Sequence, residues 1–172
     1  NGGLPKFLTR DIRTFARDAE GQEITLPDSM GVKGGYLPSY LSDNFQFYLK
    51  SYFKAFIETT KNYVHPRGPI FMVEIDYETS FGRLLDPGSA DYHKDVLANH
   101  YPQFLADRYE GNIKKLNTRY KEKNADFDAV EPPRAFTDLT LEKYPKVLDW
   151  FRFREYMLNE YLETLEDVFK SY

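Results

Sequence analysis

The chain has 172 residues, of which 41% are apolar and 29% charged, a composition typical of a globular protein with one sizeable hydrophobic core. Its formal net charge of −4 argues against a nucleic-acid partner or an anionic membrane surface, because both favour clustered lysine and arginine. No apolar run approaches the length of a membrane span. The absence of cysteine excludes disulfides, thiolate zinc sites and a thiol nucleophile. The cellular compartment stays open, with the cytoplasm slightly favoured over secretion.

Glycine and proline interrupt the first part of the chain too often for a long helix, so residues 1–40 are predicted to form loops and short turns. From Leu41 onward, apolar residues recur at steps of three and four, which predicts an amphipathic helix that ends before Pro66. Residues 70–75 form a nearly continuous apolar run, typical of a strand buried on both faces of a parallel sheet. A long loop, residues 79–99, is expected to follow it.

The rest of the chain is predicted to be helical, with helices around residues 101–109 and 113–120 and a last helix that begins near Asp149. One strand between long helices cannot form a complete α/β domain, because a parallel strand needs neighbours on both sides to satisfy its backbone. The sequence also begins without an initiator methionine. We therefore expect the chain to be a piece of a larger protein.

Acidic side chains share one face of the predicted strand and its C-terminal end. Alternation along a strand places Glu74, Asp76 and Glu78 on the same side. In a barrel of parallel strands the C-terminal strand ends line the active site, which favours Glu78 and leaves Glu74 deepest. Like charges in a partly desolvated pocket raise carboxyl pKa values, as a general acid requires. The same spacing also fits carboxylates paired with Arg or Lys from other strands, or oxygen ligands for Mg²⁺ or Ca²⁺.

The histidines do not add a catalytic or metal site to this picture. His65, His93 and His100 fit no zinc-binding spacing and are expected to be surface or loop residues. No metal or other cofactor is predicted for the chain.

The run from Gly68 to Glu78, Gly-Pro-Ile-Phe-Met-Val-Glu-Ile-Asp-Tyr-Glu, resembles the segment of glycoside hydrolase family 35 that ends the fourth barrel strand. In that family the final glutamate is the acid/base, and Glu78 takes its place. The stretch Asn1–Leu8 is similar to the family's Gly-Gly-Leu-Pro-x-Trp-Leu segment, which follows the third strand and lies near the sugar. The two matches occur in the order that the family requires.

Downstream segments resemble a second family. Residues 104–109 and 113–120 are similar to the Arg-Tyr-Gly, Leu-Asn, Tyr pattern of family 42 β-galactosidases. The archaeal exo-β-D-glucosaminidases join features of both families and have a Glu-Pro-Pro-Arg stretch like residues 131–134. In the usual family 35 pattern an Asn precedes the acid/base, and Tyr77 stands there in this chain. Tyr77 and Asp76 are therefore candidates, with Glu74, for binding the substrate.

These resemblances imply a helix-rich α/β segment of a (β/α)8 TIM barrel, about strands three to four with their helices. The whole chain would belong to one catalytic domain: residues 1–40 as a loop region, 41–78 as a helix and the acid/base strand, and 79–172 as an active-site loop and helices. The implied activity is that of a retaining exo-β-glycosidase acting on terminal β-linked galactose or glucosamine, without a cofactor.

In such an enzyme Glu78 is the general acid/base, while the nucleophile is expected from a later strand that these residues do not include. The chain alone is therefore expected to be inactive, and its partners are the carbohydrate substrate and the remaining barrel segments. A homo-oligomer is compatible with this prediction. The alternative is a non-catalytic fragment or homologue that binds carbohydrate or a protein partner through its aromatic surface.

Overall fold

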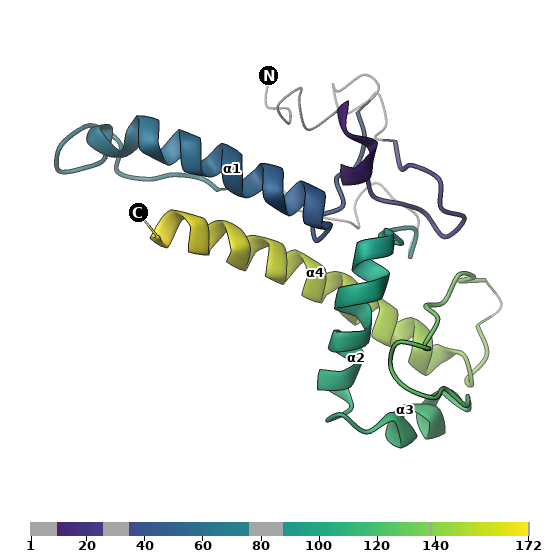
Figure 1. Ribbon diagram of the computed structural model, residues 1–172. Helices are drawn as coiled ribbons and strands as arrows, with labels where there is room; N and C mark the ends of the chain where they lie inside the picture. Colours follow the sequence, from purple (N-terminus) through teal and green to yellow (C-terminus); the bar gives the residue numbers. More distant parts are fainter. Residues whose placement is uncertain (1–9, 26–34, 76–87, 138, 172) are drawn as a thin grey trace.

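The computed structural model of the chain describes residues 10–25, 35–75, 88–137 and 139–171 (Figure 1). The described part is helix-rich, and its extended segments meet only in isolated bridges. The elements in chain order are η2 (Ile12–Thr14), α1 (Asp43–Thr60), η4 (Lys61–Tyr63), η5 (Val96–His100, a π-helix), α2 (Tyr101–Arg108), α3 (Ile113–Tyr120) and α4 (Tyr144–Lys170).

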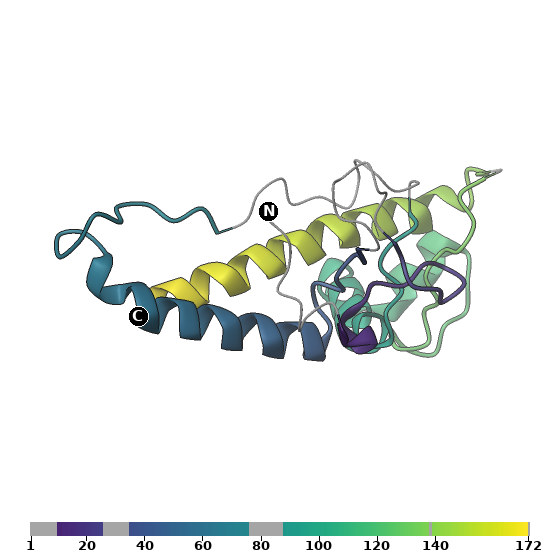
Figure 2. The same ribbon diagram turned by 90° about the horizontal axis from the view of Figure 1, so that it is seen from above.

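The N-terminal part, residues 10–25 and 35–40, is irregular, as the sequence predicts. Its backbone is tied together by isolated antiparallel bridges, such as the bridge between Phe15 and Pro38. The N–H of Ala16 donates to the carbonyl of Leu37 at 2.8 Å. These residues form a small folded layer beside the start of α1 (Figure 2).

The predicted first helix is confirmed as α1. It begins after Ser42, whose hydroxyl accepts a hydrogen bond from the N–H of Phe45 and so satisfies one of the free donors of the first turn. Phe45, Leu49 and Ile57 are buried along one face of α1. The helix forms because its apolar stripe packs on the neighbouring helix α4.

Helix α4 begins at Tyr144, five positions before the Asp149 at which the sequence places its start. Pro145 lies in the first turn of α4, where its missing N–H has no helical partner to lose. The backbone of the preceding turn is held by the carbonyl of Thr140, which accepts from Lys143 and Tyr144. The prediction is therefore wrong by about one turn, since a proline can open a helix as well as end one.

Helices α1 and α4 lie side by side with their C-terminal ends at the same end of the molecule (Figures 1 and 2). Aromatic rings fill the contact: Tyr161 packs on Phe45 at 6.3 Å between ring centroids, and Phe169 packs on Phe53 at 5.2 Å. The first half of α4 packs instead on α2 and α3, around the fully buried Trp150. Aromatic side chains, which make up 17% of the sequence, thus form much of the core.

The packing of α2, α3 and α4 centres on one buried carboxylate, Asp149, which is completely inaccessible to solvent. It accepts hydrogen bonds from Arg108 Nε at 2.6 Å, Tyr109 Oη at 2.5 Å and Tyr120 Oη at 3.0 Å. Burial, together with the neighbouring carboxylate, raises the pKa of Tyr109 to about 12. The phenol therefore stays protonated and keeps donating at every physiological pH.

Residues 71–75 depart from the predicted buried strand. They are extended but form no ladder with any other described segment, and the side chains of Phe71 and Met72 are 85% and 77% exposed. The only described backbone pairing nearby is the parallel bridge between Val64 and Ile70. The physical reason is that a buried strand needs neighbours, and the described part of this chain supplies none.

The structure also refines two smaller predictions. The predicted loop 79–99 ends early, because helical structure begins at Lys94 and continues through η5 into α2. Of the two environments expected for the histidines, surface or loop, His93 has the second: it lies just before the helical chain but is buried, with 3% exposed, and its Nδ1 accepts a hydrogen bond from the N–H of Asp95. It works as a local cap at the point where the helical chain starts.

We expect Asp149→Ala to lower the free energy of unfolding by about 3 kcal/mol, because it leaves a guanidinium and two phenols without their shared acceptor. Urea unfolding followed by circular dichroism measures this loss. Asp107→Ala is the matched control, since Asp107 is exposed and its carboxylate accepts a hydrogen bond from the side chain of Gln103; it should change stability by less than about 0.5 kcal/mol. Equal effects of the two substitutions would contradict a central role for Asp149.

Candidate functional site

Three of the four predicted site residues, Asp76, Tyr77 and Glu78, lie outside the described residues, so the structure gives no geometry for them. The fourth, Glu74, is exposed near the end of the extended segment. What the structure does describe is the two ends of the segment that contains them: the chain up to Ile75 and the chain from Gly88 onward.

The upstream end is fixed by a tight turn between α1 and the extended segment. The N–H of His65 donates to the carbonyl of Ile70 at 2.7 Å, and the N–H of Ile70 donates to the carbonyl of Tyr63 at 2.9 Å. Gly68 lies against the backbone of Tyr63 so closely that a Cβ there would overlap it. Because of this turn the extended segment runs back along α1, opposite to it in direction (Figures 1 and 2).

The downstream end, residues 88–93, is held in the core at several points. The indole N–H of Trp150 donates to the carbonyl of Gly88 at 3.4 Å, and the hydroxyl of Tyr92 donates to the carbonyl of Pro133 at 2.5 Å. Gly88 has a φ of +85°, and a Cβ there would overlap the ring of Phe136. The chain that returns from the undescribed segment 76–87 thus enters a fixed position.

Asp91 is the polar centre of this downstream end and is completely buried. Its Oδ1 accepts hydrogen bonds from the backbone N–H of Arg17 at 3.0 Å and from that of His93 at 2.9 Å. Burial raises the pKa of Asp91, an effect that the Ser39 hydroxyl and the two N–H groups partly offset. Its Oδ2 and the hydroxyl of Ser39 are buried without a hydrogen bond of standard geometry among the described residues.

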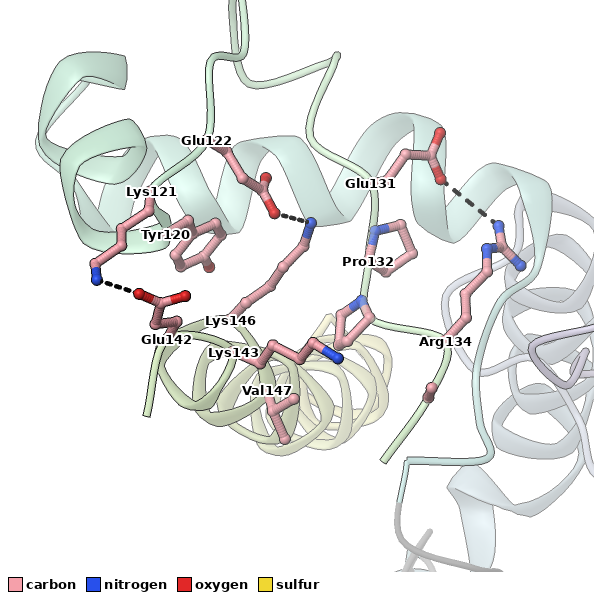
Figure 3. Close-up of a pocket in the computed structure, with 12 residues that line it drawn as sticks. Tyr120, Lys121, Glu122, Glu131, Pro132, Arg134, Glu142, Lys143, Lys146 and Val147 are labelled. Carbon is pink, nitrogen blue, oxygen red and sulfur yellow. Dashed lines mark hydrogen bonds and ion pairs between the residues drawn. The ribbon is translucent and has the colours of Figure 1, made fainter. Parts of the chain in front are cut away.

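A hollow of about 560 Å³ lies between the end of α3, the start of α4 and residues 131–134 (Figure 3). Residues 131–134 are the Glu-Pro-Pro-Arg stretch that resembles the glucosaminidases. Its rim carries ion pairs between Lys146 and Glu122 at 2.7 Å and between Lys121 and Glu142 at 2.6 Å. The second pair is well exposed and contributes little to stability. These carboxylates are already paired with lysines, so they form a polar rim and do not form a candidate catalytic group.

Sequence reasoning missed both buried carboxylates. Asp149 stands in an apolar run between Val147 and Trp150, and an acid in such a run is a signal of a buried polar contact. Its three partners, Arg108, Tyr109 and Tyr120, all lie in the segments that resemble family 42. Asp91 carries no comparable signal, because its partners are backbone groups far away in the sequence or next to it.

Among residues 10–25, 35–75, 88–137 and 139–171, no three His, Asp or Glu side chains are gathered as a metal-binding group. No helix in that part of the chain is both long and apolar enough to cross a membrane.

Comparison with known families gives a match over most of the chain: residues 40–172 match the sequence model of glycoside hydrolase family 42, described as β-galactosidase. The chain belongs to this family. The predicted glycosidase relationship and its family 42 features are thereby confirmed, whereas the more specific resemblance to family 35 stays a prediction.

The chain is also similar to two curated archaeal exo-β-D-glucosaminidases. It is 26% identical to the enzyme of Pyrococcus horikoshii over 178 aligned residues, which cover 100% of this chain and 21% of the relative. It is 27% identical to the enzyme of Thermococcus kodakarensis over 171 residues, which cover 96% of this chain and 20% of the relative. The chain thus spans about a fifth of the length of these relatives.

The burial of Asp91 leads to a prediction about pH. A carboxyl whose pKa is raised on folding destabilises the folded state as the pH rises through that raised value, and the penalty is absent below the unfolded pKa. Asp91→Asn keeps the acceptor oxygen and removes the charge, so its stability relative to the natural chain should be more favourable at pH 7 than at pH 4. Urea unfolding at the two pH values measures the difference.

Asp18→Asn is the matched control for that experiment, because Asp18 also accepts two backbone N–H groups, at 2.7 and 3.0 Å, but in a half-exposed turn. A pH trend for Asp91→Asn that is no larger than the trend for this control, or that has the opposite sign, would show that the buried carboxyl is not penalised at neutral pH.

Proposed function

We propose that the chain is the part of a retaining exo-β-glycosidase that carries the acid/base carboxylate, Glu78. The observation that carries this proposal is the family 42 match over residues 40–172, which includes Glu78. The resemblance of residues 68–78 to a segment that ends in an acid/base glutamate supports the same assignment. The two exo-β-D-glucosaminidase relatives add support for hydrolysis of a terminal β-linked sugar.

The arrangement of the described elements supports a barrel segment. Helices α1 and α4 run in the same direction in space (Figures 1 and 2). The extended segment 71–75 comes between these helices in the sequence, and it runs in the direction opposite to α1. A (β/α)8 barrel has this alternation, with strands that all point to the end at which the helices begin. We therefore propose that residues 70–78 form the fourth barrel strand of one catalytic domain that includes residues 1–172.

The exposed apolar side chains of residues 71–73 fit this proposal. In a barrel both faces of a strand are covered, and its backbone is paired with a strand on either side. Relatives about five times as long as the matched region contain ample chain for those neighbours. The activity is accordingly proposed for the longer polypeptide, in which the remaining barrel strands supply the second carboxylate.

In this mechanism Glu78 protonates the glycosidic oxygen as the leaving group departs, while the nucleophile from outside the chain forms a covalent glycosyl-enzyme. Glu78 then takes a proton from the water that releases the sugar. The two carboxyl groups of retaining enzymes stand about 5–5.5 Å apart. Neither step needs a metal or an organic cofactor.

The substrate is proposed to be a terminal β-linked galactose or glucosamine. Asp76 and Tyr77 directly precede the acid/base in sequence and are proposed to contact the sugar near C2, with Glu74 deeper on the predicted face that it shares with Asp76. A carboxylate such as Asp76 stabilises a 2-ammonium group more strongly than a neutral 2-hydroxyl, because the hydrogen bond is then charge-assisted on both sides. This favours the amino sugar, in line with the two curated relatives.

The test of the proposal is Glu78→Gln in a polypeptide long enough to match the curated relatives from end to end. The substitution should lower kcat by about 10²–10⁴-fold, the range that general acid–base catalysis contributes, on a substrate with a poor leaving group. Added azide should restore turnover of a substrate with a good leaving group, since azide needs no general base to attack the glycosyl-enzyme.

Glu74→Gln is the matched control, since it makes the same change on the same predicted face four residues upstream; it should weaken substrate binding more than it lowers kcat. A wild-type rate for Glu78→Gln on an unactivated substrate would show that another residue is the acid/base.

A further inference from the structure

The hollow between the end of α3, the start of α4 and residues 131–134 is lined by described residues from these three parts of the chain. Its volume of about 560 Å³ lies within the range of small-molecule sites, which is about 300–1,000 Å³. In Figure 3 the rings of Tyr120 and Pro132 stand on opposite sides of the hollow, and lysine side chains extend between them. The hollow therefore offers apolar rings and charged groups to the same small ligand.

The charged groups of the rim are paired with one another. Three ion pairs between described residues surround the hollow, each joining a cation to a glutamate: Lys146 to Glu122, Lys121 to Glu142, and Arg134 to Glu131. An ammonium group has three donors and a carboxylate has about four acceptor positions, so each pair keeps hydrogen-bonding capacity that its own contact does not use. Free donors therefore lie next to free acceptors around the hollow.

Such a rim favours one class of ligand over others. A small ion competes with a partner that is already in place, because the rim charges neutralise one another at contact distance. A purely apolar ligand covers charged groups without replacing the water that they bind, which costs free energy. A hydroxyl group donates and accepts at once, so it binds both members of a pair without separating them. Saccharides combine hydroxyl groups with C–H faces that pack on rings.

Lys143 decides between neutral and cationic saccharides. It also lines the hollow, and no described carboxylate lies within ion-pair distance of its ammonium group. The lining thus carries four cations and three carboxylates. An excess of positive charge disfavours a protonated amino sugar relative to a neutral one, although solvent screens part of the effect at an exposed rim.

We propose that the hollow is a carbohydrate-binding site that holds a neutral saccharide between the rings of its walls and the ion pairs of its rim. Lys146 and Glu122 are its central pair, because the Lys146 ammonium lies 5.9 Å from the centroid of the Tyr120 ring and so joins the polar rim to the aromatic surface. The site goes beyond the proposed hydrolysis, since binding there needs neither Glu78 nor a nucleophile.

The test is a titration of the 172-residue chain with methyl β-D-galactopyranoside, followed through the backbone amide signals in NMR spectra. The signals of residues 120–122 and 146–147 should shift and saturate, with a dissociation constant on the order of 1–10 mM, because so small a ligand gains little free energy. Protonated methyl β-D-glucosaminide and sodium sulfate are the comparison probes, and each should bind at least about threefold more weakly.

Three results of this titration would overturn the proposal. The first is the absence of saturating shifts at residues 120–122 and 146–147. The second is tighter binding of sulfate, which would make the hollow an anion site. The third is tighter binding of the glucosaminide, which would contradict the preference for a neutral sugar. The test of Glu78 is turnover, so none of these results bears on the acid/base assignment.

Lys146→Met tests the central pair, because it keeps the length of the side chain and removes the donors beside Glu122. It should weaken galactoside binding by about fivefold or more. Lys170→Met is the matched control, since Lys170 pairs with Glu166 at 2.7 Å near the other end of α4. The control should keep the dissociation constant within about twofold of the natural chain. Equal affinities of the two variants would show that the rim pair does not bind the sugar.

The indole N–H signal of Trp150 reports whether each variant is folded, because Trp150 is fully buried in the core. If Lys146→Met does not fold, Glu122→Gln is measured in the same way. That substitution replaces a charged acceptor of the same pair with a neutral one, and it should weaken galactoside binding by about threefold or more. An unchanged dissociation constant for a folded Glu122→Gln would overturn the proposal.

Discussion

A carboxylate taken completely out of water must be given hydrogen-bond donors, and Asp149 receives them from α2, from the turn that follows it and from the end of α3. This requirement fixes how the short helices pack on α4, because the guanidinium of Arg108 and the hydroxyls of Tyr109 and Tyr120 must converge on two oxygens. The aromatic core around Trp150 then fills the space beside them. The anchoring of residues 88–93 depends on the same arrangement, since Trp150 donates to Gly88.

The helices were predictable from the sequence where burial of one face decides the structure. The apolar stripe from Leu41 predicts α1 because it is the stripe that packs on α4. The sequence places the start of α4 too late because Lys143 and Lys146 interrupt the apolar periodicity in its first turn. Pro145 does not resolve this, because proline is compatible with either end of a helix. The state of residues 71–75 could not be predicted at all. Their apolarity indicates a buried strand, but burial also depends on neighbours that the described chain does not contain.

Only the part of the candidate site that has a recognisable residue pattern or family motif can be predicted from the sequence. Glu78 and its neighbours come from strand alternation and from the family resemblance, and the family 42 match agrees with the resemblance at the level of the family. Asp91 was not predictable, because its partners are backbone N–H groups, one of them far away in sequence at Arg17. Contacts of that kind have no side-chain signature, so only a structure brings them to light.

The chain forms its own helical core, and residues 71–75, which lead toward Glu78, have no strand partner among the described residues. Amide hydrogen exchange on the 172-residue chain tests it most directly. The account predicts strong protection in α2, α3 and the first half of α4, because their amides are bonded within helices around Asp149, and exchange within seconds at residues 71–75. Slow exchange at residues 71–75 would contradict the account, since it would mean that the strand is already paired within the chain.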